Sequence, residues 1–104
     1  LDLYGCQLTQ VPMELSELTA LEELVLWGNN FSQADFTCLK ELKNLKKLDL
    51  GVCQLTQVPA IINELTALEE LNLEENNLSQ ADFSLLYNEI SLREFTICST
   101  NLRT

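Results

Sequence analysis

Two blocks of nearly identical sequence lie 47 residues apart in this chain of 104 residues. The segment CQLTQVPMELSELTALEEL at 6–24 returns as CQLTQVPAIINELTALEEL at 53–71, and NNFSQADF at 29–36 returns as NNLSQADF at 76–83. Periods of about 20–50 residues are typical of stacked units, each of which buries its apolar face only against its neighbours. The duplication therefore predicts a stack of similar units, and function must reside in the positions that differ.

A shorter frame recurs inside each block. Four segments, 21–31, 45–55, 68–78 and 92–102, share the frame L-x-x-L-x-L-x-x-(N/C/T)-x-L. The first eight residues, LDLYGCQL, carry the same frame without its beginning. The positions that correspond, 23 or 24 residues apart, are Leu1, Leu24, Leu48, Leu71 and Phe95.

On these residues the chain resembles the leucine-rich-repeat family over essentially its whole length. The resemblance implies an α/β fold: a curved, right-handed solenoid with a parallel β-sheet on the concave face and short helices and turns on the convex face. It implies one domain over residues 1–104 with about four and a half repeats. Neither end shows a polar cap, so we expect either a fragment of a longer array, which we favour, or ends that associate with other molecules.

The L-x-L part of the frame predicts a strand, because residues two apart point to the same face. Asn29 and Asn76 follow the strands and are suited to satisfying turn backbone groups. Cys6, Cys53 and Thr100 take that position elsewhere, and a cysteine there is predicted to be a small buried hydrophobe and weak donor. The expected inward pairs are Leu24/Leu26, Leu48/Leu50, Leu71/Leu73 and Phe95/Ile97.

The segments between the strands alternate in type. Pro12 and Pro59 restrict the backbone ahead of two of them, which favours a short helix after each proline. The segment at 31–45 has no proline, and its Ser32 and Asp35 have the spacing of a capping box. A two-turn helix is predicted there, with a buried side made of Phe36, Leu39 and Leu42.

The net charge of −10 comes from 16 acidic and 6 basic residues. Nucleic acids and anionic membranes are bound through Lys and Arg, so this balance argues against both. It favours a basic protein partner, whose encounter with the chain would be faster. No apolar run approaches the ~20 residues of a membrane span, and no signal segment opens the chain.

The four cysteines do not form an obvious disulfide framework. Cys6 and Cys53 are two units apart, which at ~4.8 Å per strand separates their Cα atoms by ~10 Å, beyond the ~7 Å reach of a disulfide. Cys38 is expected on the opposite wall, and Cys98 lies off the column of Cys6 and Cys53. We therefore expect free thiols and, with no visible signal peptide, an intracellular location.

Signals of catalysis are missing from the sequence. There is no histidine, the commonest general base and metal ligand, and no phosphate-binding or calcium-binding loop. Acidic doublets such as Glu22/Glu23 and Glu69/Glu70 occupy variable, solvent-facing positions and indicate a charged surface. We expect no enzymatic activity, no cofactor and no metal site.

The positions that vary between units form columns on the predicted sheet. One charged column runs through Glu22, Lys46, Glu69 and Arg93, and we interpret it as structural; its neighbour runs through Glu23, Lys47, Glu70 and Glu94. Tyr4 and Trp27 are equivalent positions of adjacent units and should lie side by side. Such residues supply much of the energy at interfaces, although they can equally stack on each other without a partner.

The candidate partner-binding residues share the open side of the sheet, aromatic toward the N-terminus and acidic toward the C-terminus. They are Tyr4, Val25, Trp27, Asp49, Glu70, Asn72, Glu74 and Glu75. A protein with an apolar knob and a basic rim fits both halves, so the sequence predicts a non-enzymatic protein-interaction scaffold. The alternatives are a spacer segment of a larger protein, or a targeting domain of an enzyme encoded outside this chain.

Overall fold

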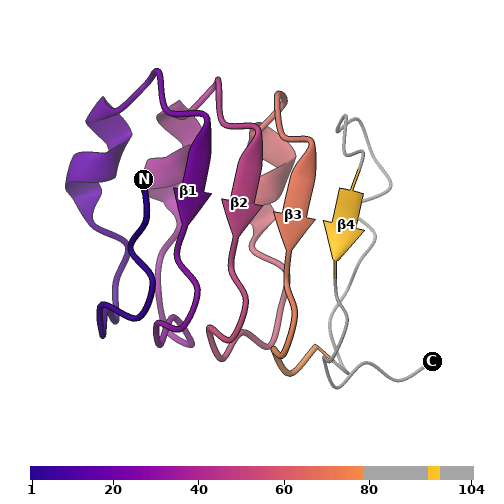
Figure 1. Cartoon of the computed structure of the whole chain (residues 1–104). Coiled ribbons are helices and arrows are strands. Elements are labelled where there is room, and N and C mark those ends of the chain that lie inside the picture. The colour runs from indigo at the N-terminus through magenta and orange to yellow at the C-terminus, as the bar shows by residue number, and fades with distance from the viewer. Residues whose placement is uncertain (79–93, 97–104) are drawn as a thin grey trace.

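The chain winds as a right-handed solenoid, and over residues 13–72 short helices alternate with strands that lie on the opposite wall (Figure 1). The structure, a computed structural model, describes residues 1–78 and 94–96. The predictions for Ile97, Cys98 and Thr100, for Arg93 and for the side chains of residues 94–96 lie outside the described residues. Within the described part, no helix has the length and apolar character needed to cross a membrane.

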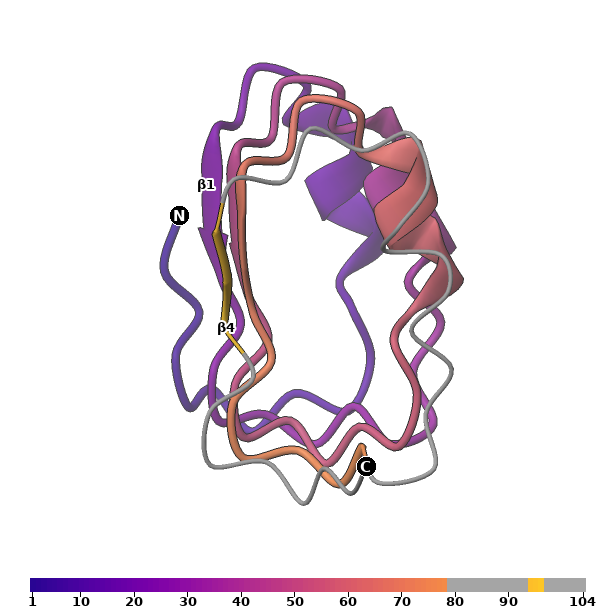
Figure 2. The same cartoon turned by 90° about the vertical axis from the view of Figure 1, so that its right-hand side faces the viewer.

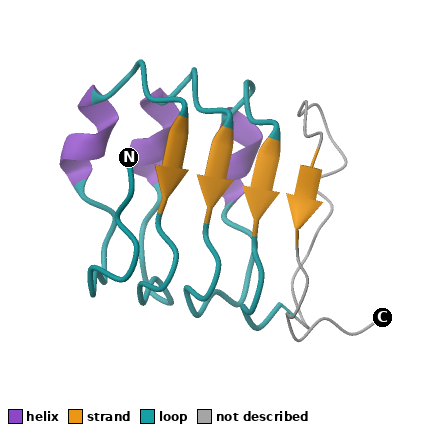
Figure 3. Cartoon of the chain, in the orientation of Figure 1, coloured by secondary structure: helices purple, strands orange, loops and turns teal. Residues whose placement is uncertain are grey.

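Four three-residue strands form a parallel sheet in chain order (Figure 3). They are β1 (Glu23–Val25), β2 (Lys47–Asp49), β3 (Glu70–Asn72) and β4 (Glu94–Thr96). The register pairs Leu24 with Leu48, Leu48 with Leu71 and Leu71 with Phe95, which confirms the alignment of the frames. The incomplete first frame joins the sheet through a parallel bridge between Asp2 and Val25.

Short 3-10 helices form the wall opposite the sheet, as the view along the solenoid shows (Figure 2). They are η1 (Met13–Glu17), η2 (Thr37–Glu41) and η3 (Ala60–Glu64). Pro12 and Pro59 are the residues immediately before η1 and η3, as the sequence predicts. We call the sheet surface that faces away from these helices the concave face.

The predicted start of η2 is wrong. The helix begins at Thr37, and Ser32 donates its hydroxyl to Asn30 Oδ1 (3.0 Å) instead of capping a helix. Asp35 accepts hydrogen bonds from the backbone N–H (2.9 Å) and hydroxyl (2.8 Å) of Thr37. The helix is also shorter than two α-helical turns, although its buried side is the predicted one: Phe36, Leu39 and Leu42.

The spacing of the apolar residues accounts for the 3-10 geometry. Three residues per turn place residues i and i+3 on one side, and Phe36, Leu39 and Leu42 are spaced by three. The N–H of Leu39 donates to Phe36 O and that of Leu42 donates to Leu39 O, each at 3.0 Å. The same i to i−3 bonds link Leu15 to Pro12 and Leu18 to Leu15 in the first unit, although Leu18 is exposed there.

The core lies between the sheet and the helices. The inward leucines of β1–β3 and of the residues that follow these strands are at most 2% exposed, and burying such a side chain contributes ~1.5–3 kcal/mol. The first unit is less covered: Leu1 is 49% exposed and Leu18 44%.

Buried asparagines link neighbouring units. Asn76 Oδ1 accepts from the N–H groups of Cys53 (2.8 Å) and Leu55 (3.0 Å), and its Nδ2 donates to Leu50 O (2.8 Å) and Leu73 O (3.0 Å). Three of these four groups belong to the preceding unit. The predicted turn role of Asn76 is therefore confirmed, and it includes bonds between units.

The two cysteines of this column behave differently. Cys53 is fully buried, and its single S–H is shared between two acceptors, Leu26 O (3.1 Å from Sγ) and Gly51 O (3.3 Å), as predicted for a small hydrophobe with a weak donor. The same prediction is wrong for Cys6, which is exposed.

Candidate functional site

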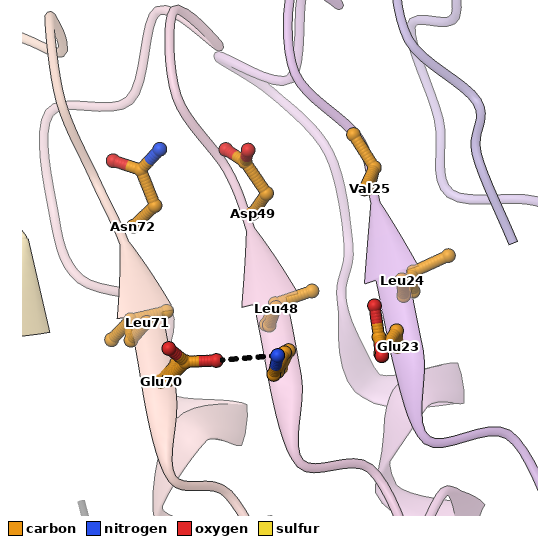
Figure 4. Close-up of a pocket in the computed structure, with 9 residues that line it drawn as sticks. Glu23, Leu24, Val25, Leu48, Asp49, Glu70, Leu71 and Asn72 are labelled. Atoms are coloured by element: carbon orange, nitrogen blue, oxygen red, sulfur yellow. Dashed lines mark ion pairs between the residues drawn. The ribbon is translucent and has the colours of Figure 1, made fainter. Parts of the chain in front are cut away.

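A hollow of about 260 Å³ opens on the concave face over three adjacent strands (Figure 4). Its walls come from the same three positions of each strand, because the parallel register aligns them. The lining residues are Glu23, Leu24, Val25, Lys47, Leu48, Asp49, Glu70, Leu71 and Asn72. The repeat thus produces a continuous surface whose chemistry changes from strand to strand.

Four of the predicted partner-binding residues meet at this hollow: Val25, Asp49, Glu70 and Asn72. Sequence reasoning left out Glu23 and Lys47, which also line it. The sequence pattern indicates Glu23, because it lies two residues before Val25 and residues two apart share a strand face.

An ion pair crosses the hollow between Lys47 Nζ and Glu70 Oε2 at 3.2 Å (Figure 4). It belongs to the column next to the one that we interpreted as structural from the sequence. Both side chains are solvent-accessible, so the pair contributes only ~0–1 kcal/mol to stability.

Tyr4 and Trp27 lie in the turns that follow the first strand segment and β1. Their rings stack with centroids 4.6 Å apart and planes inclined by 3°. The adjacency inferred from the sequence is confirmed, including the stacking across neighbouring units. Partner binding by the pair stays a prediction. Tyr4 is 59% exposed, so part of the stack faces solvent.

Gly51 makes room for the indole of Trp27. A Cβ atom at Gly51 would lie 2.6 Å from Trp27 Cδ1 and 2.9 Å from Nε1, closer than real Cβ contacts. Oδ1 of Asp49 lies 3.2 Å from the same point. Trp27 is therefore held between Tyr4 and the next unit, at the edge of the hollow that Asp49 lines. Sequence reasoning missed Gly51, although it is the smallest residue in the column of Tyr4 and Trp27.

Asp49 and Asn72 also shape the turns that follow their strands. Asp49 Oδ1 accepts from the N–H of Gly51, and Asn72 Oδ1 accepts from the N–H of Glu74, each at 2.9 Å. Asp2 does the same for Tyr4 at 2.9 Å. Such local bonds are a known preference of Asp and Asn in turns. The sequence analysis did not predict this role in the turns, although Asp2, Asp49 and Asn72 occupy equivalent positions of their units.

Glu74 and Glu75 lie in the turn after β3, outside the lining of the hollow. Glu74 accepts a hydrogen bond from Asn72 Nδ2 at 3.3 Å. Glu75 is exposed, with a left-handed φ of 55°. The structure thus separates these two predicted residues from the four that line the hollow.

The described cysteines, Cys6, Cys38 and Cys53, are free thiols. Burial raises the pKa of the Cys53 thiol to about 11. Burial, followed by the negative charge of Asp35, also raises the pKa of Cys38. Both thiols are therefore held in the neutral form, which is the less nucleophilic one.

A second hollow, of about 440 Å³, lies on the helical wall at η1 and η2. Met13 borders it and is 78% exposed. The other lining residues are Gln10, Val11, Asp35, Thr37, Cys38 and Lys40. Among residues 1–78, no group of three or more His, Cys, Asp or Glu side chains is placed to hold a metal ion.

Comparisons with known proteins agree with this geometry. A family model described as "Leucine rich repeat" matches residues 19–78. A solved leucine-rich-repeat protein of Leptospira interrogans is similar over 100% of this chain and 26% of its own, with a TM-score of 0.85 and 29% identity. An internalin of Listeria monocytogenes is similar over 91% of this chain and 26% of its own, with a TM-score of 0.71 and 24% identity.

A comparison with curated proteins found no significant match. The chain spans about a quarter of the length of both solved structures. The likeness to the internalin, at 24% identity, supports the fold alone.

Proposed function

We propose that this chain, which belongs to the leucine-rich-repeat family, is a non-enzymatic scaffold that binds a protein partner on its concave face. Leucine-rich-repeat domains typically bind proteins, and this supports an interaction repeat in general terms. The choice of face rests on one observation. The hollow over β1–β3 lies beside a stacked Tyr–Trp pair that is held in place before any partner arrives.

The charges around the hollow favour a basic partner. Glu23, Asp49 and Glu70 line it together with a single cation, Lys47, and the whole chain carries a net charge of −10. Complementary charge mainly raises the association rate and makes it sensitive to salt. The aromatic pair is expected to supply more of the affinity, because Trp and Tyr bury large areas at low entropic cost.

The experiment compares two substitutions with the same change in charge on opposite walls. Binders are selected from a displayed library against the wild-type chain and then measured against Glu70→Lys on the concave face and Glu64→Lys on η3. We expect Glu70→Lys to weaken binding by about tenfold or more and Glu64→Lys to change it less than about twofold.

Circular dichroism first establishes that both variants fold as the wild type does. If selected binders respond equally to the two substitutions, net charge governs binding and the concave face does not. If the selection yields no specific binder, the spacer interpretation is favoured over this proposal.

A further inference from the structure

We propose that the turns after β1, β2 and β3 form a docking surface for a partner segment that carries an apolar side chain close to a basic one. The apolar side chain would pack on Val52 and Trp27, and the basic one would pair with Glu74 and Glu75. This inference rests on the proposed function, because these turns directly follow the strands that line the hollow, and it specifies the chemistry of the partner. We call this surface the turn row; it consists of Trp27, Gly28, Gly51, Val52, Glu74 and Glu75.

Backbone hydrogen bonds continue the sheet into these turns, which follow the arrowheads of β1, β2 and β3 in Figure 1. The N–H of Gly28 donates to Gly51 O (3.0 Å), and the N–H of Val52 donates to Glu74 O (2.9 Å). Equivalent residues of successive turns are therefore held beside one another, as in neighbouring strands. The first unit lies before β1 and β4 lies after β3, so the exposure of the turn row does not depend on where the chain begins.

A strained residue occupies the middle turn. Val52 has a left-handed φ of 50°, a conformation that is unfavourable for a residue branched at Cβ. The equivalent residue of the preceding turn is Gly28, which adopts a left-handed φ of 82° without a steric cost. Glycine would therefore suit the fold better than valine at Val52, which is only half-buried. Strained residues cluster at ligand contacts and active sites, so the valine side chain points to a contact with a partner.

The indole of Trp27 lies over Gly51, the residue that precedes Val52. A Cβ atom at Gly51 would lie 2.6 Å from Trp27 Cδ1, so the absence of a side chain there makes room for the ring. The indole also stacks on Tyr4 at a centroid distance of 4.6 Å. It is therefore positioned before a partner arrives, and little side-chain entropy remains to be lost on binding. An aromatic and a branched aliphatic side chain thus form the apolar end of the turn row.

Charge complementarity selects a basic neighbour for the apolar side chain. Glu75 is exposed, and Glu74 is positioned by a hydrogen bond that it accepts from Asn72 Nδ2 (3.3 Å). Each carboxylate oxygen has two acceptor sites, so both groups retain the capacity to accept from a lysine or arginine. The segments 27–31, 51–55 and 74–78 contain no lysine or arginine. An acidic or phosphorylated segment would therefore be repelled from this end of the turn row.

The spacing of the turns sets the spacing of the two side chains in the partner. Val52 and Glu75 occupy equivalent positions of adjacent turns, which are about one strand spacing (~4.8 Å) apart. Two side chains that are adjacent or one residue apart in an extended segment span a similar distance. The partner segment is therefore expected to carry its basic residue within two positions of its apolar one.

The experiment begins with random peptides of about twelve residues, displayed on phage and selected on the wild-type chain. We expect the enriched peptides to share an apolar residue within two positions of a lysine or arginine. These peptides are then synthesised, and their affinity is measured by calorimetry. Emission of Trp27, the single tryptophan of the chain, should shift on binding, because an apolar side chain displaces water from the indole.

Substitutions of Val52 separate strain from recognition. Val52→Gly and Val52→Asn introduce residues that tolerate a left-handed φ, so the midpoint of urea unfolding should stay the same or rise. Both should nevertheless weaken peptide binding by about tenfold, because the apolar contact is lost. Val52→Ile retains a branched apolar side chain and should bind within about threefold of the wild type. A purely structural role of Val52 does not combine unchanged or higher stability with weaker binding.

A matched pair of substitutions tests the acidic end. Glu75→Gln and Glu64→Gln each remove one negative charge, the first on the turn row and the second on η3 at the opposite wall. We expect Glu75→Gln to weaken peptide binding by about fivefold and to reduce its salt dependence. Glu64→Gln is the control and should stay within about twofold of the wild type.

Four results would overturn the inference. They are a selection without enriched peptides, enriched peptides that lack a basic residue, unchanged affinity in Val52→Asn, and a lower urea midpoint in both Val52→Gly and Val52→Asn. A protein binder that depends on Glu70 but tolerates Val52→Gly and Glu75→Gln would remove the turn row as a docking site and leave the proposed function intact. Peptides that depend on Val52, found without any concave-face protein binder, would retain the turn row and contradict the proposed function.

Discussion

Asparagine and cysteine alternate at one position of successive units and meet the same need with different chemistry. An asparagine amide accepts and donates, so Asn29 accepts from the N–H of Leu8 (2.9 Å) and donates to Leu3 O (3.0 Å) and Leu26 O (2.9 Å). The Cys53 thiol is only a weak donor. Its unit therefore depends on Asn76 of the next unit for the acceptor. Each asparagine thus serves two units, its own and the preceding one.

Replacing Asn76 by Ala should destabilise the chain by roughly 3 kcal/mol. The substitution removes the acceptor of two buried N–H groups and the donor of two carbonyl groups, and unsatisfied buried groups cost ~1–3 kcal/mol each. The free energy of unfolding in urea measures the loss. Asn63→Ala, at an exposed position of η3, is the control and should change stability by less than about 0.5 kcal/mol. Equal effects would show that the hydrogen bonds between units are unimportant.

The Cys53 thiol should make stability fall at alkaline pH. Its pKa rises from an ordinary value of 9.0 to about 11 in the folded chain, because burial disfavours the thiolate. The unfolded chain therefore loses this proton first, and the contribution of the neutral thiol, full below pH 9, is lost as pH rises toward 11. A shift of this size corresponds to roughly 2–3 kcal/mol.

The measurement compares urea unfolding of the wild type and Cys53→Ala from pH 8 to about pH 11. All other ionisable side chains are the same in both proteins, so the difference between the two curves isolates Cys53. We expect the wild type to lose more stability than the variant across this interval. Parallel curves would contradict the buried, neutral thiol.

The short helices show how a local pattern selects its geometry. Apolar residues at every third position, as in Ile62, Leu65 and Leu68, match the three residues per turn of a 3-10 helix. The strands are equally short, yet they align because parallel neighbours repeat the same inward leucines. The turns after the strands then place Tyr4, Trp27 and Gly51 in one row.

Gly51→Ala should disrupt that row. The new methyl group would lie 2.6 Å from Trp27 Cδ1, so the indole must move and its stack with Tyr4 must change. We expect a loss of ~1–3 kcal/mol in stability and an altered near-ultraviolet dichroism of Trp27. The backbone of Gly51 does not have a left-handed φ, so the effect should be steric.

A double-mutant cycle tests the cause. In a Trp27→Ala background the methyl group meets no indole, so Gly51→Ala should then cost much less. The same cost in both backgrounds would show that the clash with Trp27 is not the reason.

In the solenoid as a whole, the residues that hold the units together are separate from the charged residues of the concave face. Buried leucines and asparagines hold the units together, whereas the concave face carries charges that contribute little to the fold. The excess of acidic groups is a cost that the core offsets, because a net charge of −10 repels itself in the compact state.

Added salt should therefore stabilise the folded chain. Screening weakens repulsion between exposed charges, and between 10 mM and 0.5 M sodium chloride we expect the free energy of unfolding to rise by an amount on the order of 1 kcal/mol. Sodium sulfate is compared with sodium chloride at equal ionic strength near the low end of this range. If screening is the cause, the two salts should raise the free energy of unfolding equally. A fall in stability with salt would show that attractive ion pairs outweigh the repulsion.

Sequence pattern was sufficient for the architecture and for part of the candidate site. The constant spacing of Leu24, Leu48 and Leu71 predicted the parallel register, and the matching positions of Tyr4 and Trp27 predicted their contact. The predicted helix start at Ser32 was wrong, because a capping spacing says nothing about where competing turn bonds form. Asp35 bonds to Thr37 there and delays the helix.

The sequence by itself determined which residues face inward and which units lie side by side. Both follow from the periods of two and three residues and from the repeat length, which can be read directly from the chain. Contacts between outward-facing side chains needed the folded structure. The ion pair of Lys47 with Glu70, the indole over Gly51 and the turn bond of Asp49 each depend on a rotamer chosen among neighbours from another unit or a local turn. Backbone periodicity does not set those rotamers, because several staggered side-chain conformations fit the same strand position.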